Sequence, residues 1–265
     1  MKRVAFVAAV LAMFTTSVSD LRAGEPARDE GQPPPGFRSL FNGQDLSGWK
    51  VPEGDGGHWR VVDGVIDYDA RSEAEEDKNL WTEEEFGDFI LMLDWRIKQT
   101  TGRFSMPVVL QDGSHLKDAA GEDIKLDLPN ADSGIYLRGS SKSQINIWCW
   151  PVGSGEVYGY RMDQSMPPEV RAGVTPRLNA DKPVGEWNRF IIIVAGDRLT
   201  VLLNDQQIIA GAQLPGIPEK GPLALQHHGG FRDGQYSPAS SLMQFRNVYI
   251  KELGKAGAEE RAASE

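Results

Sequence analysis

The clearest evidence for the fold class is Arg189–Gly211, which reads RFIIIVAGDRLTVLLNDQQIIAG. Runs of aliphatic side chains are interrupted twice in it, at Gly196-Asp197 and again at Asn204-Asp205. Such pairs are typical of tight turns between antiparallel strands, because they tolerate the backbone conformations that those turns need. The stretch therefore predicts strand, turn, strand, turn, strand.

The rest of the chain repeats this pattern of short strands and turns. Phe89–Lys98, FILMLDWRIK, alternates hydrophobic residues with a second, more polar face, and His58–Tyr68, HWRVVDGVIDY, has an Asp-Gly turn at its centre. Gly134–Gly139 and Ser241–Leu253 read as further strands, and no segment sustains the helical period of about 3.6 residues. With 29 Gly and 16 Pro to supply turns, the sequence predicts an all-β fold. We expect a two-sheet antiparallel β-sandwich, with a barrel as the main alternative.

Two long segments without a clear strand pattern interrupt this series. Thr100–Asp132 includes VVLQDGS, which reads as a small hairpin of its own, and Asp163–Gly185 is rich in proline. Long loops on a β scaffold usually form functional lids or rims. We therefore expect both insertions to border a site.

The two ends of the chain differ from its middle. Lys2 and Arg3 precede an apolar run, Val4–Phe14, and a polar segment of small residues follows. This order is typical of a cleavable secretory signal peptide, and the run is too short to span a bilayer. Cleavage is expected after Ala23, with Ser19 as the alternative. The chain then divides into a signal peptide (1–23), a linker (24–35), one domain (36–253) and a flexible tail (254–265). We expect an exported protein, periplasmic or secreted.

Charge and cysteine content exclude several partners. The net charge is −10 and no basic patch exists, which argues against nucleic acid and anionic membranes and favours a neutral small-molecule substrate. No later segment has the length of a membrane span. The single cysteine, Cys149, cannot form an internal disulfide, and we expect a buried thiol. No motif indicates a nicotinamide or nucleotide cofactor, and the oligomeric state is open.

One stretch concentrates aromatic and amide side chains. Ser143–Met162 reads SQINIWCWPVGSGEVYGYRM, and strand alternation places Ile145, Ile147 and Cys149 on one apolar face. The other face carries the amides and indoles of Gln144, Asn146, Trp148 and Trp150. Such a row suits a partly apolar ligand rich in hydroxyls, so these residues are the predicted substrate-binding platform. The alternative is a second buried sheet face.

A series of motifs in order gives a family resemblance. They are GFRSLFNGQDLSGW, HWRVVDGVI, FGDFILMLDWR, DSGIYLRG, GEVYG, VGEWNRF, VLLND, GPLALQHHG and QFRNVYIKEL, from Gly36 to Leu253. The set resembles the 3-keto-disaccharide hydrolase family, whose fold is similar to the jelly rolls of concanavalin-A-like lectins and glucanases. The family usually has Asn-Ser-Gly-Ile and then a Glu–Gln pair on the next strand. Here these positions read Asp132-Ser-Gly-Ile and Gln144/Asn146, so the role of that glutamate is not carried over.

The resemblance implies a glycoside oxidised at C3. The C3 ketone acidifies the C2 proton, so one base can form an enolate, which expels the aglycone from C1; water addition then gives net hydrolysis. Ordinary glycosidases instead use two carboxylates. We therefore expect an exported enzyme that cleaves 3-keto-glycosides by elimination or net hydrolysis. A non-catalytic, lectin-like carbohydrate-binding module is the alternative. An ordinary endoglucanase is disfavoured, because no Glu-x-Asp-x-x-Glu pattern occurs.

The candidate catalytic residues follow from these needs. Arg138 shares a predicted face with Tyr136, and its guanidinium is suited to an enolate oxygen; the alternative is an ion pair with a carboxylate. His227 and His228 must point to opposite faces of a strand. Histidine is the natural general base near neutral pH, so His228 is the preferred base, with His227 and Tyr136 as binding residues.

Two carboxylates complete the set. Glu156 follows Gly-Ser-Gly in a loop beside the platform and is a candidate acid, base or ligand; a rim carboxylate is the alternative. Asp132 has the same candidate roles, although an Asp before Ser-Gly can simply cap a turn. Together with His227 and His228 these side chains offer oxygen and nitrogen ligands, so a divalent metal is possible, but no local metal motif exists.

Overall fold

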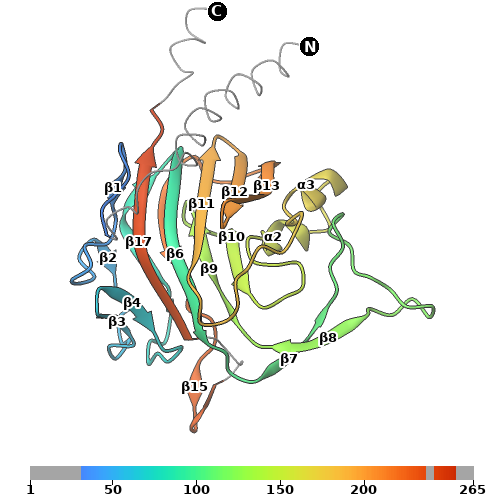
Figure 1. Ribbon diagram of the computed structural model, residues 1–265, viewed down its shortest axis with the longest axis horizontal. Coiled ribbons are helices and arrows are strands. Elements are labelled where there is room, and N and C mark those ends of the chain that lie inside the picture. The colour runs from blue at the N-terminus through green and yellow to red at the C-terminus, as the bar shows by residue number, and fades with distance from the viewer. Residues whose placement is uncertain (1–30, 237–241, 255–265) are drawn as a thin grey trace, which may run out of the picture. The chain divides into compact units, whose positions relative to one another are not determined.

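Two antiparallel sheets pack face to face in the computed structural model, which describes residues 31–236 and 242–254 (Figure 1). Both sheets are open, so the predicted β-sandwich is confirmed and the barrel is excluded. The unit they form begins at Pro33. The predicted signal peptide (1–23), much of the linker and nearly all of the tail lie outside the described residues. No helix among those described is long and apolar enough to cross a membrane.

The larger sheet contains Arg189–Gly211, the segment for which the sequence predicted three strands. Its strands, in spatial order, are β13 (Gln206–Gln213), β12 (Arg198–Leu203), β11 (Asn188–Ala195), β6 (Phe89–Gln99), β17 (Leu242–Glu252), β4 (Val65–Tyr68) and β3 (Trp59–Val62), with β1 (Arg38–Ser39) also paired to β17. The predicted turns fall between these strands. At the second one Asn204 and Asp205 adopt positive φ values of 50° and 64°, the conformation that favours Asn and Asp at this kind of hairpin.

The smaller sheet carries the outer face on which the site is built. In order, its strands are β10 (Ser140–Trp148), β9 (Asp132–Leu137), β14 (Gly221–Leu225), β5 (Leu80–Phe86) and β2 (Trp49–Lys50). Alternation along β9 and β10 turns Ile135, Leu137, Ile145 and Ile147 toward the larger sheet, where they join one continuous core. The intervening residues therefore face outward.

The first insertion forms an arm built on a two-stranded ribbon, β7 (Arg103–Pro107) with β8 (Lys125–Pro129). A second short ribbon, β15 (Phe231–Arg232) with β16 (Gln235–Tyr236), also lies apart from the two sheets. Figure 1 shows β7 and β8 running out beside the sandwich. The predicted small hairpin lies between them, closed by a bridge from Val109 to His115. It packs closely on the second insertion: a Cβ at Gly113 would lie 3.1 Å from the carbonyl oxygen of Arg171.

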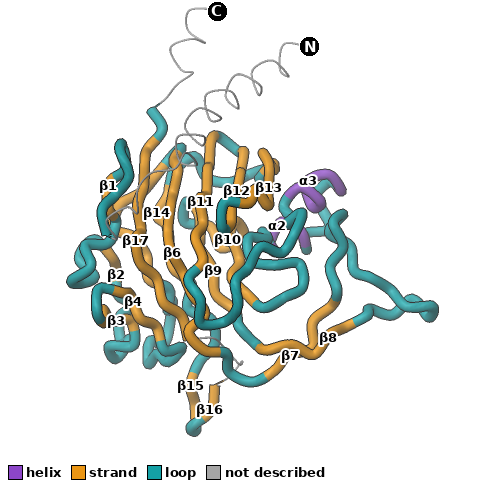
Figure 2. Tube along the Cα trace, in the orientation of Figure 1, coloured by secondary structure: helices purple, strands orange, loops and turns teal. Residues whose placement is uncertain are grey.

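The second insertion is not a plain loop. The segment around it holds two short helices, α2 (Tyr158–Arg161) and α3 (Pro168–Gly173), as Figure 2 shows. Neither was expected from the sequence. Both are too short to repeat a hydrophobic face, which is the signal that predicts a helix. The proline that α3 carries at its first position is acceptable there, because the first turn leaves that N–H unbonded.

Candidate active site

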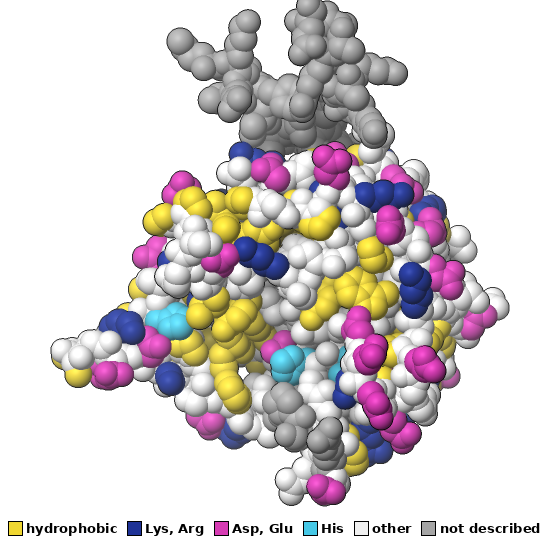
Figure 3. Space-filling view, turned by 180° about the vertical axis from the view of Figure 1, so that it is seen from behind, with side chains coloured by type: hydrophobic (Ala, Val, Ile, Leu, Met, Phe, Trp, Pro, Cys, Tyr) yellow, Lys and Arg dark blue, Asp and Glu magenta, His cyan; other side chains and the backbone are white. Residues whose placement is uncertain are grey.

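A carboxylate and a histidine meet on the outer face of the smaller sheet. Asp132 begins β9, and His228 follows the end of β14, so two adjacent strands deliver them. His228 Nδ1 lies 3.6 Å from Asp132 Oδ2, and their side chains remain 32% and 26% exposed. Burial raises the pKa of Asp132 to about 6, although the charge of His228 acts against this rise. Figure 3 shows histidine side chains in a hollow between hydrophobic patches on the side facing away in Figure 1.

A chain of polar side chains continues from this pair across the sheet. Gln144 Nε2 donates to Gln226 Oε1 (2.5 Å), and Gln226 Nε2 donates to the Tyr136 hydroxyl (3.1 Å). Gly134 makes the arrangement possible, because a Cβ there would lie 2.4 Å from Gln144 Nε2. The charge of Asp132 helps to raise the pKa of Tyr136, after the larger effect of burial. Tyr136 therefore stays a neutral hydroxyl close to the Asp132–His228 pair.

An indole borders the polar chain. The rings of Trp81 and Tyr136 lie 5.6 Å apart with a tilt of 46°, and Trp81 Nε1 donates to Asp77 Oδ2 (2.5 Å). Trp81 is half-buried, so part of its ring faces solvent. Neither Trp81 nor Gln226 was among the predicted site residues. The alternation of GPLALQHH pointed to Gln226, which lies two positions before His228, but no sequence signal placed Trp81 on the same face.

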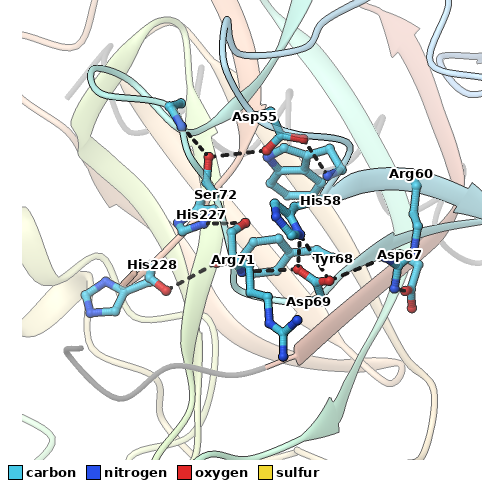
Figure 4. Close-up of polar contacts among 12 residues, drawn as sticks. Asp55, His58, Arg60, Asp67, Tyr68, Asp69, Arg71, Ser72, His227 and His228 are labelled. Atoms are coloured by element: carbon cyan, nitrogen blue, oxygen red, sulfur yellow. Dashed lines mark hydrogen bonds and ion pairs between the residues drawn. The ribbon is translucent and has the colours of Figure 1, made fainter. Parts of the chain in front are cut away.

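His227 turns the other way, as the strand alternation predicted. It is 7% exposed, packs edge-on against Tyr68 (4.7 Å) and donates from Nε2 to the carbonyl oxygen of Arg71 (3.2 Å). Burial lowers the pKa of His227 to about 4. Figure 4 shows its ring within this cluster while the ring of His228 points away. The expectation that His227 contacts substrate is wrong, because its ring is enclosed by protein.

Arg138 does not share a face with Tyr136, so that expectation is also wrong. β9 ends at Leu137, and Arg138 has a φ of 51°, which ends the alternation of side chains. Its guanidinium is 1% exposed. It donates to the carbonyl oxygens of residues 87, 196 and 218 and to Asp88. Arg138 therefore ties loops together inside the protein and cannot reach a substrate on the outer face.

Glu156 is not a rim carboxylate. Its side chain and that of Arg161 form an ion pair that is 0% and 1% exposed. Burial raises the pKa of Glu156, and Arg161 opposes the rise. The backbone N–H of Asn146 donates to the carbonyl oxygen of Glu156, and the N–H of Gly155 donates to the carbonyl oxygen of Asn146. The side-chain oxygen of Asn146 also accepts from the N–H of Tyr158. Asn146 is 4% exposed, so both side chains serve the structure of this loop and neither is open to a ligand.

The predicted platform is largely covered. Trp148 is 2% exposed and donates from Nε1 to the carbonyl oxygen of Gly153. It stacks on Trp150 with ring centres 3.9 Å apart, and Val109 of the arm packs in the same cluster. Of the two indoles, only Trp150 keeps part of its surface open, and Gln144 is partly exposed as well. Cys149 is half-buried, whereas a buried thiol was expected.

Of the predicted residues, the structure thus brings together Asp132, His228, Tyr136 and Gln144. Across the described part of the chain, no three His, Cys, Asp or Glu side chains gather closely enough to hold a metal ion. The four ligands considered from the sequence accordingly do not form one group. The remaining arrangement offers a proton acceptor, hydroxyl and amide donors, and an indole, all on one open face.

Comparison with known proteins identifies the relatives of the chain. A family model described as a 3-keto-alpha-glucoside-1,2-lyase-like domain matches residues 36–251. None of the curated proteins matches. A solved structure from Parabacteroides distasonis, provisionally assigned as a glycosyl hydrolase, is 22% identical with a TM-score of 0.55, covering 87% of this chain and 94% of its own. A second, from the same organism and with the same provisional assignment, is 19% identical with a TM-score of 0.49, covering 82% and 94%. The first likeness supports the fold.

Proposed function

The chain belongs to the 3-keto-alpha-glucoside-1,2-lyase-like family, and from this premise we propose that it cleaves 3-keto-glycosides at the Asp132–His228 pair. The family indicates a carbohydrate-active, glycosyl hydrolase-like enzyme. The observation that supports the finer proposal is the pair itself: a half-exposed histidine beside a carboxylate, on a face with hydroxyl and amide donors.

His228 is the proposed base. Its Nδ1 faces Asp132, which leaves Nε2 to take the C2 proton of the sugar. The C2–H bond breaks, its electron pair forms the enolate with the C3 carbonyl, and the enolate then expels the aglycone oxygen from C1. The aglycone leaves as an alcohol once its oxygen takes a proton. Addition of water to the resulting enone completes a net hydrolysis. Asp132 orients the ring, as carboxylates beside catalytic histidines do.

Tyr136 is the proposed donor to the ketone oxygen, because both N–H groups of the Gln144 amide already donate within the protein. The Tyr136 oxygen accepts from Gln226, which leaves its own O–H free to point at a ligand. Because burial raises the pKa of Tyr136, the hydroxyl keeps that proton at working pH. Donors aimed at a developing oxyanion are worth about 10²–10³ in rate. This role was expected of Arg138, which the fold places elsewhere.

A binding module would need the aromatic face alone. The half-exposed Asp132–His228 pair beside Trp81 and Tyr136 favours an enzyme, because a lectin has no use for a desolvated carboxylate whose pKa is raised. The two functions differ in turnover. A binding module would hold the keto-disaccharide without consuming it.

The test uses a 3-keto-disaccharide labelled with deuterium at C2. The purified protein should cleave it and release the label to solvent, whereas the unoxidised disaccharide should be inert because its C2 proton is too weakly acidic. Retention of the label in the product would rule out elimination, and cleavage of the unoxidised sugar would point to direct displacement at C1. Export is proposed separately: N-terminal sequencing of the protein from the cell exterior or periplasm should begin at Gly24.

A further inference from the structure

A second pocket lies at the end of the sandwich, beside the covered platform. Its volume is about 190 Å³. A water molecule occupies about 30 Å³ in the liquid, so the pocket has room for about six waters or one monosaccharide-sized ring. Its walls join aromatic rings to polar groups and include Trp95, Trp148, Trp150, Cys149, Asn179 and Asp181.

Two polar atoms of this pocket have no protein partner. Trp95 is 1% exposed, and its indole N–H donates to nothing among the described residues. Asp181 uses one carboxylate oxygen to accept from the N–H of Ser154 (2.7 Å), while its other oxygen is buried and finds no partner within the described chain. Buried donors and acceptors left unpaired cost free energy. The side chains that carry this donor and this acceptor both line the cavity, so a ligand with hydroxyl groups is a candidate partner for both.

We propose that this pocket binds a neutral, unoxidised pyranose ring. The C–H face of the ring would pack on the indole of Trp150, whose opposite face is taken by Trp148. One sugar hydroxyl accepts from Trp95 Nε1, and another donates to Asp181. A neutral ligand fits, because burial already raises the pKa of Asp181 and a ligand carboxylate would meet that charge. The amide of Asn179 also lines the wall and offers a further polar contact.

The pocket is a binding site apart from the Asp132–His228 pair. Trp148 is paired with Asp132 in the strand register and also lines the pocket. It therefore lies between the pocket and the Asp132–His228 pair. No histidine is among the described residues that line the pocket, and its one carboxylate, Asp181, is assigned here to binding. The inference therefore holds whether or not the proposed reaction at His228 is correct.

Cys149 supplies a reporter, since it lines the pocket and is the only cysteine in the chain. The rate at which N-ethylmaleimide modifies it would be followed by intact mass, with and without methyl α-D-glucopyranoside. Saturating glucoside should slow the reaction at least fivefold, and glycerol at equal concentration should not. No protection, or equal protection by glycerol, would overturn the proposal, because the pocket would then hold water or any polyol.

Variants separate this site from the catalytic pair. Trp95→Phe keeps the ring and removes the donor, and Asp181→Asn removes the charge; each should raise the half-protecting concentration of glucoside about tenfold. The charge of Asp181 also raises the pKa of the Cys149 thiol, after the larger effect of burial, so protection is compared as a rate ratio within each variant. Asp197→Asn, in a turn outside the pocket, and His228→Ala should leave protection unchanged. Unchanged protection in both pocket variants would refute the assignment of these contacts.

Discussion

Asp132→Asn should stabilise the protein at neutral pH while it removes activity. Burial raises the pKa of Asp132 from 3.8 to about 6, so the folded carboxyl keeps its proton over a range where the unfolded one has lost it. Stability from this group is fully present below pH 3.8 and is lost as the pH rises through 6. At about 1.4 kcal/mol per pH unit, the ionised carboxylate costs roughly 3 kcal/mol at pH 7. Asparagine has no charge to desolvate, so the variant should exceed the wild type by up to that amount.

Urea unfolding followed by tryptophan fluorescence, from pH 3.5 to 8, measures the difference. The two proteins should be equally stable at the acid end and diverge above pH 4. Asp163→Asn is the matched control, because a hydrogen bond from Lys142 lowers the pKa of Asp163. The stability that this carboxylate contributes is present above its unfolded pKa of 3.8 and is lost only as the pH falls below it, so this variant should be less stable than the wild type by a nearly constant amount above pH 4. If Asp132→Asn is less stable than the wild type at pH 7, or differs by the same amount at every pH, the desolvation argument fails.

Three further predictions concern activity and buried charges. His228→Ala should lower kcat/KM on the 3-keto-disaccharide by about 10²–10⁴. The wild-type rate should also rise as the pH passes about 6, where Asp132 ionises. A rate that does not change with pH would show that Asp132 does not act together with His228. Arg138→Met should cost about 3 kcal/mol of unfolding free energy, because three carbonyl oxygens lose their donor at about 1 kcal/mol each. The kcat per folded molecule should be unchanged, and a fall in kcat would return Arg138 to the site. Glu156→Gln should lower the free energy of unfolding by about 3–5 kcal/mol, because it leaves the charge of Arg161 without a carboxylate partner. The double variant Glu156→Leu with Arg161→Met should regain at least half of that free energy. Thermal unfolding of the three proteins measures both differences.

The fold could be predicted where the determining contacts are local. The strands of 189–213 follow from alternation and from turn residues that lie in the sequence itself, and β3 and β4 follow from Asp63-Gly64 in the same way. The pairing of β7 with β8 could not be predicted, because the residues between them give no sign of which segments meet. Periodicity assigns an element and a face, but long-range pairing depends on the whole chain.

The site was predictable to the same extent. Alternation placed His228 and Gln226 on one face and His227 on the other, and the structure agrees. The argument failed for Arg138 because the strand stops one residue earlier. It failed for Glu156 because the loop backbone pairs with the edge of β10 and turns the carboxylate toward Arg161.

Gln144 shows how the choice of amide or carboxylate at one position shapes the rest of the site. Its Nε2 donates to the carbonyl oxygen of Ser133 and to Gln226 Oε1, both of them acceptors. A glutamate at this position could donate to neither. The Gln226 amide would then have to turn over, and the Tyr136 hydroxyl would have to donate to it. With glutamine, that hydroxyl proton stays available to a substrate. An amide is also no base at this position, so the proposed proton transfer falls to Asp132 and His228, which meet on the same outer face.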